Sequence, residues 1–216
     1  MMDDKEKMVP RIRFRGFEDA WERLKFNSIV TKITDHSHDT QLQHIEYANI
    51  ISNSGKLRNI NRDYADSREG IRFKKGDILY GKLRPYLNNW WLAKFAGIAV
   101  GDFWVLRVNN SFSSLFAYAL IQSESYQNIA NLTTGTKMPR SDWNIVSTAL
   151  FNIPTKGEQI KIGKGSQLLD DLIVANEKKG QQLKGLKKLF MEKIFSQAWR
   201  FKGFSDPWEQ RKAIVN

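Results

Sequence analysis

The chain contains no cysteine, which excludes disulfides, thiolate metal ligands and thiol nucleophiles. It has no apolar run close to the roughly 20 residues that a membrane-spanning helix needs. Its first residues, MMDDKEKMVP, lack the apolar stretch that is typical of a signal peptide. These absences predict a soluble, cytoplasmic protein without a membrane partner.

Catalytic and metal-binding patterns are scarce as well. His36, His38 and His44 lie near Asp35 and Asp39, but without cysteine or further histidine this ligand set is thin for a metal. The sequence has no P-loop, no GxGxxG fingerprint and no amino-methyltransferase motif. We therefore expect no metal, no cofactor and no catalysis by this chain.

Acidic residues are outnumbered, since 23 Asp and Glu stand against 34 Lys and Arg, which gives a formal net charge of +11. Such an excess serves solubility, or it serves a polyanionic partner, because clustered cations release counterions from nucleic acid. Aromatic residues lie among the cations, as in many nucleic-acid-binding proteins, although most aromatics in any domain form its core.

One motif occurs near both ends of the chain. Residues 11–25 read RIRFRGFEDAWERLK, and residues 198–212 read AWRFKGFSDPWEQRK. At an offset of 187 the identical pairs are Arg13/Arg200, Phe14/Phe201, Gly16/Gly203, Phe17/Phe204, Asp19/Asp206, Trp21/Trp208, Glu22/Glu209 and Lys25/Lys212. The chain thus holds one unit and the opening of a second. The aromatics predict a structural plug where each unit begins, with a partner-docking surface as the alternative.

The part between the repeats predicts an α+β domain. Strand signals occur at 77–80 and 97–108, and the LFNIP segment reads as a strand that ends at Pro154. Between them we expect one helix, capped by Ser113 or Ser114, and a short helix capped by Ser141 or Asp142. The residues expected on one face of the first helix are Leu115, Tyr118, Ala119, Gln122, Tyr126 and Ile129.

Residues 158–197 contain no proline and predict a long, coiled-coil-forming α-helix. An imperfect heptad seam, the expected helix-pairing face, comprises Leu169, Leu172, Asn176, Leu183, Leu186 and Phe190. The alternative is that the helix packs back onto its own domain. Internal glycines weaken a helix by about 1 kcal/mol each relative to alanine, so this helix should depend on packing.

Four parts of the chain resemble the specificity subunits of type I restriction–modification systems. PRIRFRGFEDAWE (10–22) resembles the opening of the family's unit, and residues 76–107 resemble the middle of its target recognition domain. GTKMPRSDW (135–143) with FNIP (151–154) resembles the closing loop and strand, and residues 158–195 resemble the junction into the family's helix.

The resemblance implies a target recognition domain over 1–157, a spacer and dimerisation helix over 158–197, and the start of a second unit over 198–216. A complete subunit has two such domains, whose helices pair antiparallel. Each domain reads one half of a split site in double-stranded DNA. The subunit is non-catalytic and holds methyltransferase subunits, and often restriction–translocase subunits.

A chain with one recognition domain is a natural half-subunit, a truncated gene product or an engineered piece. Two copies could form a homodimer through the long helix and read a palindromic split site. Two rival functions stay open: a recognition-domain fragment of a fused DNA methyltransferase, and a helical protein–protein adaptor without a DNA role.

Reading DNA requires cations for phosphates and hydrogen-bonding side chains for bases. One candidate set lies around two glycine turns and comprises Lys74, Lys75, Lys82, Arg84 and Tyr86. The other lies in a polar loop and comprises Thr133, Thr134, Thr136, Lys137 and Arg140. The alternatives are a solvated turn for the first set and a structural loop, with Met138 and Trp143 packed inward, for the second.

Overall fold

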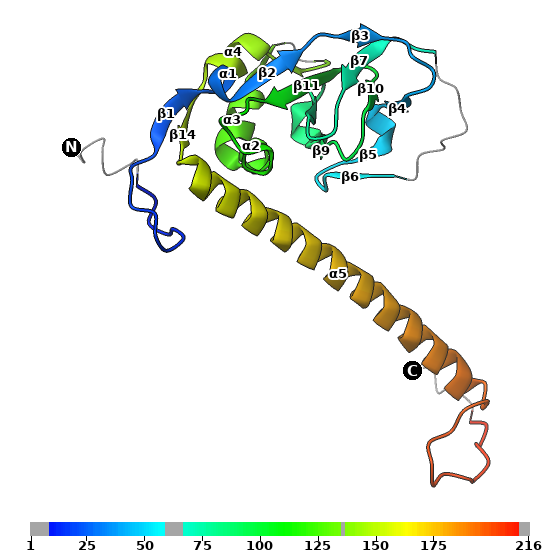
Figure 1. Cartoon of the computed structure of the whole chain (residues 1–216). Helices are drawn as coiled ribbons and strands as arrows, with labels where there is room; N and C mark the ends of the chain where they lie inside the picture. The colour runs from blue at the N-terminus through cyan, green and yellow to red at the C-terminus, as the bar shows by residue number, and fades with distance from the viewer. Residues whose placement is uncertain (1–8, 59–66, 135–136, 212–216) are drawn as a thin grey trace. The chain divides into compact units, whose positions relative to one another are not determined.

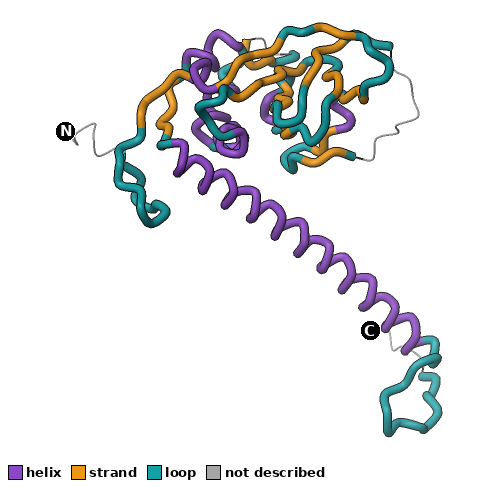
Figure 2. Tube along the Cα trace, in the orientation of Figure 1, coloured by secondary structure: helices purple, strands orange, loops and turns teal. Residues whose placement is uncertain are grey.

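The computed structural model describes residues 9–58, 67–134 and 137–211. It divides the chain into two compact units, Met1–Gln167 and Leu168–Asn216. The first unit consists of strands and short helices, whereas the second consists of most of one long helix and the segment that follows it (Figures 1 and 2). The three-part division of the sequence drawn above stays a prediction.

Two four-stranded sheets form the body of the first unit. The central sheet is antiparallel, with strand order β2 (Val30–Ile33), β11 (Phe103–Val108), β8 (Ile78–Gly81) and β9 (Trp90–Leu92). The second sheet has the order β3 (His36–Ser37), β7 (Gly70–Phe73), β10 (Gly97–Ala99) and β4 (Gln43–Ile45), and its β10–β4 pair is parallel. A small hairpin joins β5 (Ile50–Ile51) to β6 (Lys56–Leu57).

The central sheet is buried on both faces, and alternate side chains belong to different cores. Ile78 and Tyr80 of β8 pack into one core with the helices, whereas Leu79 packs into a second core with the other sheet. Trp104 and Val105 of β11 divide in the same way. Because both faces need apolar side chains, these strands read as continuous hydrophobic runs and not as alternating ones.

Four short helices cover the first core: α1 (Phe26–Ile29), α2 (Ser114–Gln122), α3 (Glu124–Ala130) and α4 (Trp143–Thr148). The expectation of one helix after Asn109 is wrong, because Ser123 has extended backbone and separates α2 from α3. The Ser123 hydroxyl accepts from Tyr126 N at 3.3 Å and donates to Leu120 O at 2.6 Å, so it caps both helix ends. Ser113 and Asp142 cap α2 and α4, as predicted.

Phe26 anchors the helical core. Its side chain is 0% exposed, and its ring lies 5.1 Å from that of Tyr126 and 5.8 Å from that of Phe151 between centroids. We expect Phe26→Ala to lower the free energy of unfolding by about 3–5 kcal/mol, because it removes a buried ring and leaves a cavity. Chemical denaturation measures this loss. Phe26→Leu should cost clearly less, and equal losses for the two variants would contradict a packing origin.

The first and last strands of the unit pair with each other. β1 (Glu22–Lys25) runs antiparallel to β14 (Leu150–Ile153), and the Phe26 amide donates to the Ala149 carbonyl at 3.0 Å. The segment before β1 packs on the start of the long helix α5 (Lys156–Phe195), where Arg13 and Trp21 both bind the carboxylate of Glu158. The N-terminal copy of the repeated motif therefore has the structural role predicted for it.

The expected long helix is present as α5, which has 40 residues and is continuous through its glycines. Gly163 lets α5 approach α2 closely, because a Cβ atom at this position would lie 2.6 Å from the Cβ atom of Leu115 in α2. Only glycine permits this close approach. The buried Gln159 adds a polar anchor, since its side chain accepts from the Ser113 amide at 2.9 Å.

Candidate nucleic-acid interface

The structure brings together two of the segments predicted to bind DNA. The turn after β8 lies beside the segment before α4, because Arg84 N donates to Pro139 O at 2.8 Å and Ser141 N donates to Lys82 O at 2.9 Å. The exposed or half-buried side chains of these two segments form a surface that we call the basic surface: Lys82, Arg84, Tyr86, Lys137, Met138 and Arg140. Residues more than fifty positions apart thus meet on one surface.

One carboxylate holds part of this surface in place. Asp102 accepts both hydrogen bonds of a bidentate pair from Arg140, at 3.2 and 2.9 Å, and its Oδ1 lies 3.6 Å from Lys82 Nζ. The hydrogen bonds from Arg140 lower the pKa of Asp102, and Lys82 adds to this effect. Two cations thus face one carboxylate, and because Arg84 and Lys137 add two more charges, the surface keeps an excess of positive charge.

Tyr47 fixes the backbone beneath the turn. Its hydroxyl accepts from Leu83 N at 2.8 Å and donates to Asp102 O at 3.0 Å. Burial raises the pKa of Tyr47, so the hydroxyl keeps its proton and continues to donate. Gly81 makes room for it, since a Cβ atom there would lie 2.7 Å from the Tyr47 hydroxyl oxygen.

Strained backbone gathers at the same place. Four non-glycine residues among those described have positive φ angles, and three of them, Asn53, Arg84 and Asn88, lie together. Asn53 N donates to Asn88 O at 2.9 Å, and Asn88 Nδ2 lies 3.4 Å from Asn53 Oδ1. Left-handed backbone in non-glycine residues costs free energy and clusters at functional sites. The two asparagines add amide donors and acceptors beside the cations.

Other predicted residues lie elsewhere or outside the described residues. Lys74 and Lys75 are exposed at the opposite end of β8 from Lys82, and a four-residue strand separates the ends by about 13 Å. Thr133 and Thr134 form strand β12 (Thr133–Thr134), which pairs with β13 (Arg140–Ser141), so part of the expected loop is a short hairpin. Thr136 lies outside the described residues.

The alternative of a purely structural loop predicted that Met138 and Trp143 both pack inward. Trp143 does pack against the helical core, but the Met138 side chain is 49% exposed. The loop therefore has a packed end and a free end. Arg140 lies between them and is 45% exposed.

Sequence patterns did not single out three residues that lie next to the basic surface. Asp102 follows Gly101, which has a φ of +97°, in a tight turn before β11, and only the fold shows that its carboxylate faces Lys82 and Arg140. Asn53 and Asn88 each belong to a polar stretch that reads as an ordinary turn. Asparagine tolerates left-handed backbone better than most residues, which is the one local signal they offer.

Acid should weaken the Asp102 pairing. The lowered pKa means that this carboxylate stabilises the fold above its ordinary pKa of about 4, and that the stabilisation is lost as pH falls through the lowered value. Asp102→Asn should therefore be less stable than the parent near neutral pH and should approach it in acid. Urea unfolding at a series of pH values measures the difference, and a difference that does not change with pH would contradict this origin.

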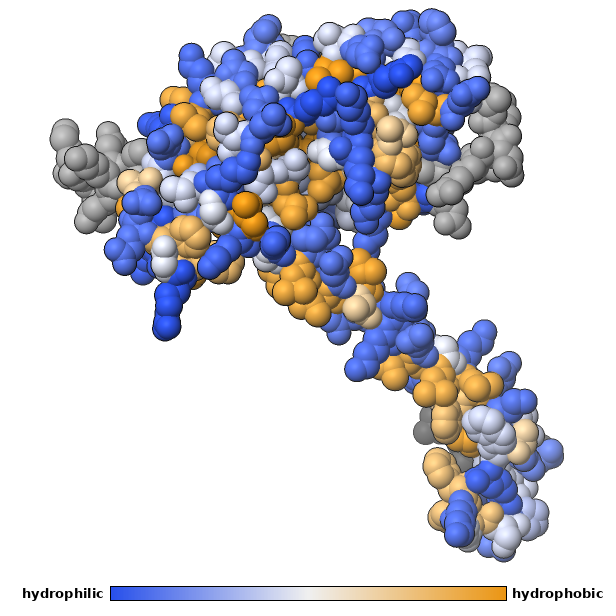
Figure 3. Space-filling model, viewed as in Figure 1, coloured by the Kyte–Doolittle hydropathy of each residue, from blue (hydrophilic) through white to orange (hydrophobic). Residues whose placement is uncertain are grey.

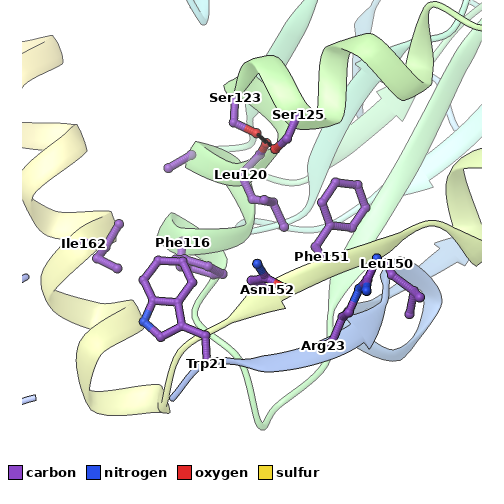
Figure 4. A pocket seen from close by; sticks show the side chains of 11 residues that line it. Trp21, Arg23, Phe116, Leu120, Ser123, Ser125, Leu150, Phe151, Asn152 and Ile162 are labelled. Atoms are coloured by element: carbon purple, nitrogen blue, oxygen red, sulfur yellow. Dashed lines mark hydrogen bonds between the residues drawn. The ribbon is translucent and has the colours of Figure 1, made fainter. Parts of the chain in front are cut away.

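A concave feature apart from the basic surface lies where β1, β14, α2 and α5 meet. It is a groove of about 680 Å³ with mostly apolar walls, and Arg23 is the charged residue among those that line it. Trp21, Phe116 and Ile162 converge at one end, and Ser123 and Ser125 lie at the other (Figure 4). The groove contains none of the residues of the basic surface.

The acidic and histidine side chains do not gather into a metal site in the part of the chain that the structure describes. In the described ranges no cluster of three or more His, Asp and Glu side chains could hold a metal ion. The ring nitrogens of the buried His44 lie 3.0 and 3.2 Å from the carbonyl oxygens of Leu42 and Arg68, so backbone groups engage them. Within the same ranges, every helix is too short or too polar to cross a membrane.

The predicted pairing residues of α5 lie on the surface of the second unit. Leu169 is 62% exposed and Leu183 is 57% exposed, and Leu172, Leu186 and Phe190 are each more than 40% exposed. Asn176 is exposed as well and donates to its own helix at Leu172 O. Hydrophobic and hydrophilic residues both lie along this helix on the face that Figure 3 shows. A helix that exposes so many large apolar side chains is suited to a partner helix.

Comparison with known proteins gives matches among solved structures. No protein-family model matches the chain, and neither does any curated protein. The HsdS subunit from Thermoanaerobacter tengcongensis is similar with a TM-score of 0.62 and 21% identity, over 87% of this chain and 51% of that one. The type I restriction–modification S subunit from M. genitalium is similar with a TM-score of 0.57 and 16% identity, over 88% and 49%.

A chain from a study of complex assembly and conformational transition of the type I R–M system also matches, with a TM-score of 0.62, 20% identity and coverage of 88% and 52%. The α+β fold expected from the sequence, a strand-rich domain followed by a long helix, is thus confirmed. It is the fold of type I restriction–modification specificity subunits, and the chain spans about half the length of those it matches.

Proposed function

We propose that this chain is a non-catalytic specificity subunit that reads one half of a split site in double-stranded DNA and holds methyltransferase subunits there. The observation that carries the proposal is the basic surface, on which two distant segments place their cations side by side in a domain with the fold of specificity subunits. Residues 1–157 are the target recognition domain in this proposal, 158–197 the spacer helix and 198–216 the start of a second unit.

The chemistry of the basic surface suits a duplex. Lys82, Arg84, Lys137 and Arg140 supply contacts to phosphates, and such contacts position a protein on DNA without reading sequence. Tyr86, which is 57% exposed, and the asparagine amides supply groups that can meet base edges. Lys74, Lys75, Thr133 and Thr134 are assigned to the flanks of this interface.

The exposed seam of α5 supports a helical partner. In the proposal two copies pair antiparallel through Leu169, Leu172, Asn176, Leu183, Leu186 and Phe190. A two-fold pair presents two recognition domains and therefore reads a palindromic split site. Restriction–translocase subunits complete the assembly.

Binding to duplex DNA at several salt concentrations tests the proposal. We expect sequence-selective binding, with the logarithm of the association constant falling linearly with the logarithm of salt concentration. We also expect a complex with a type I methyltransferase subunit in analytical ultracentrifugation. A chain without DNA affinity would instead be the helical adaptor. Binding of S-adenosylmethionine by the isolated chain would favour the fused methyltransferase.

A further inference from the structure

The contacts of the N-terminal motif define a receptor at the start of α5. Arg13 donates to both carboxylate oxygens of Glu158 at 3.0 and 2.6 Å, and Trp21 Nε1 donates to Oε2 at 3.1 Å. Glu158 is 1% exposed, so Arg13 and Trp21 supply the partners that a buried carboxylate needs. We call this carboxylate and its neighbours on α5 the Glu158 site.

The aromatic side chains of the motif complete the fit. Lys161 Nζ lies 5.1 Å from the centre of the Phe17 ring. A Cβ atom on Gly157 would lie 3.4 Å from Phe17, and one on Gly165 would lie 3.5 Å from Phe14. The first turns of α5 thus present an acidic group, a cation and two glycines that receive an arginine and three aromatic rings.

The C-terminal copy of the motif has the residues that make those contacts. Arg13, Phe14, Phe17 and Trp21 correspond to Arg200, Phe201, Phe204 and Trp208. The backbone also agrees, since Gly16 has a φ of +90° and Gly203 a φ of +97°, each in a tight turn. The second copy therefore repeats the contact residues of the first and its glycine turn.

Two aromatic side chains of the C-terminal copy are open to solvent, whereas Trp208 packs against the Phe195 ring at the end of α5. Phe201 is 68% exposed and Phe204 is 72% exposed. Arg200 donates to the backbone carbonyl of Asp206 and lies over the Trp208 ring. In the first copy the corresponding arginine, Arg13, binds Glu158 instead. An arginine and aromatic rings displayed in this way match the Glu158 site in charge and in shape.

We propose that the C-terminal motif, residues 199–208, binds the Glu158 site of a second copy of this chain, in exchange with that copy's own N-terminal motif. The inference rests on the proposed antiparallel pairing. A continuous helix of 40 residues is about 60 Å long, and antiparallel pairing brings the end of one such helix beside the start of the other. The segment after Phe195 then reaches the partner's Glu158 site.

In this exchange, the strength of binding of the N-terminal motif determines which of the two motifs binds the Glu158 site. Each copy has one Glu158 site and two motifs that fit it, so the two motifs compete. Weakening the N-terminal motif should favour the partner's C-terminal motif. Weakening the C-terminal motif should leave the N-terminal one in place without loss of the helix pair.

Because the chain lacks cysteine, pairs of introduced cysteines report contacts directly. Lys161→Cys with Ser205→Cys reports the proposed contact between copies, and Lys161→Cys with Glu18→Cys reports the contact within one copy. Position 205 corresponds to position 18, so the pairs are matched. A short thiol cross-linker should give a covalent dimer with the first pair and a linked monomer with the second. Arg13→Ala should raise the yield of covalent dimer, and Arg200→Ala should lower it.

Light scattering on the same variants distinguishes a failure of the exchange from a failure of helix pairing. A dimer in solution that gives no covalent dimer with the 161/205 pair, even with Arg13→Ala, would overturn the exchange and leave helix pairing intact. A monomer in solution would overturn the pairing and the exchange together. Single-cysteine variants control for chance cross-linking, and circular dichroism shows that each variant is folded.

Discussion

Replacing Lys82, Arg84 and Arg140 together by alanine should weaken binding to duplex DNA on the order of 100-fold near physiological salt. Each phosphate contact contributes about 0.9 to the slope of log affinity against log salt concentration, so the slope should become shallower by up to about 2.7. These three cations belong to the two segments that the backbone joins. Fluorescence anisotropy at four or more salt concentrations gives both quantities.

A matched variant tests whether the position of the three removed charges matters, and not only their number. Lys178→Ala, Lys184→Ala and Lys188→Ala remove three exposed cations from α5 and should leave the salt slope close to that of the parent. Asp102→Asn should act in the opposite direction, because it removes the carboxylate that faces Lys82 and Arg140. Equal losses from the α5 variant and the basic-surface variant would show that DNA responds only to net charge.

The second large effect concerns the helix seam. Leu183→Asp with Leu186→Asp should convert a dimer into a monomer of 25.1 kDa, because paired helices cannot bury four carboxylates. Both leucines are about half exposed in the single chain, so the first unit should keep its stability. Light scattering measures the mass, and thermal unfolding measures the stability.

A control on the same turns of α5 uses Gln181→Asp with Lys184→Asp, which has the same spacing and lies away from the seam. This variant should stay dimeric. The seam variant should still bind a half-site but lose the added affinity that two linked half-sites give to a pair. If the seam variant keeps the mass of the parent, the pairing face lies elsewhere on α5 or the partner is another protein.

Local patterns were enough to predict several elements of this fold, but not most of its strands. Apolar runs identify β8 and β11, caps identify the starts of α2 and α4, and the proline-free stretch identifies α5. The break at Ser123 was missed, because apolar spacing continues across it and a serine inside a helix pattern is unremarkable. The break becomes evident only in the structure, where the Ser123 hydroxyl binds the end of α2 and the start of α3.

The candidate site was predictable by residue type but not by arrangement. Cations near glycine turns were identifiable, yet nothing local indicates that the turn after β8 lies beside residues 139–141 while Lys74 lies at the far end of the same strand. The role of Asp102 could not be predicted for the same reason. Pairings between segments so distant in sequence arise from the tertiary fold, and a single sequence carries little trace of them.

The pairing of β1 with β14 holds the two ends of the segment 26–149 side by side. Its chain enters at Phe26 and leaves at Ala149, and the backbone groups of these two residues are hydrogen-bonded to each other. Everything between them is an insertion whose ends are already adjacent, a geometry that tolerates replacement. A different sequence closed by the same two strands could be placed on the same motif and helix. Under the proposed function, such a replacement would change the DNA half-site that is read and leave the motif and the long helix unchanged.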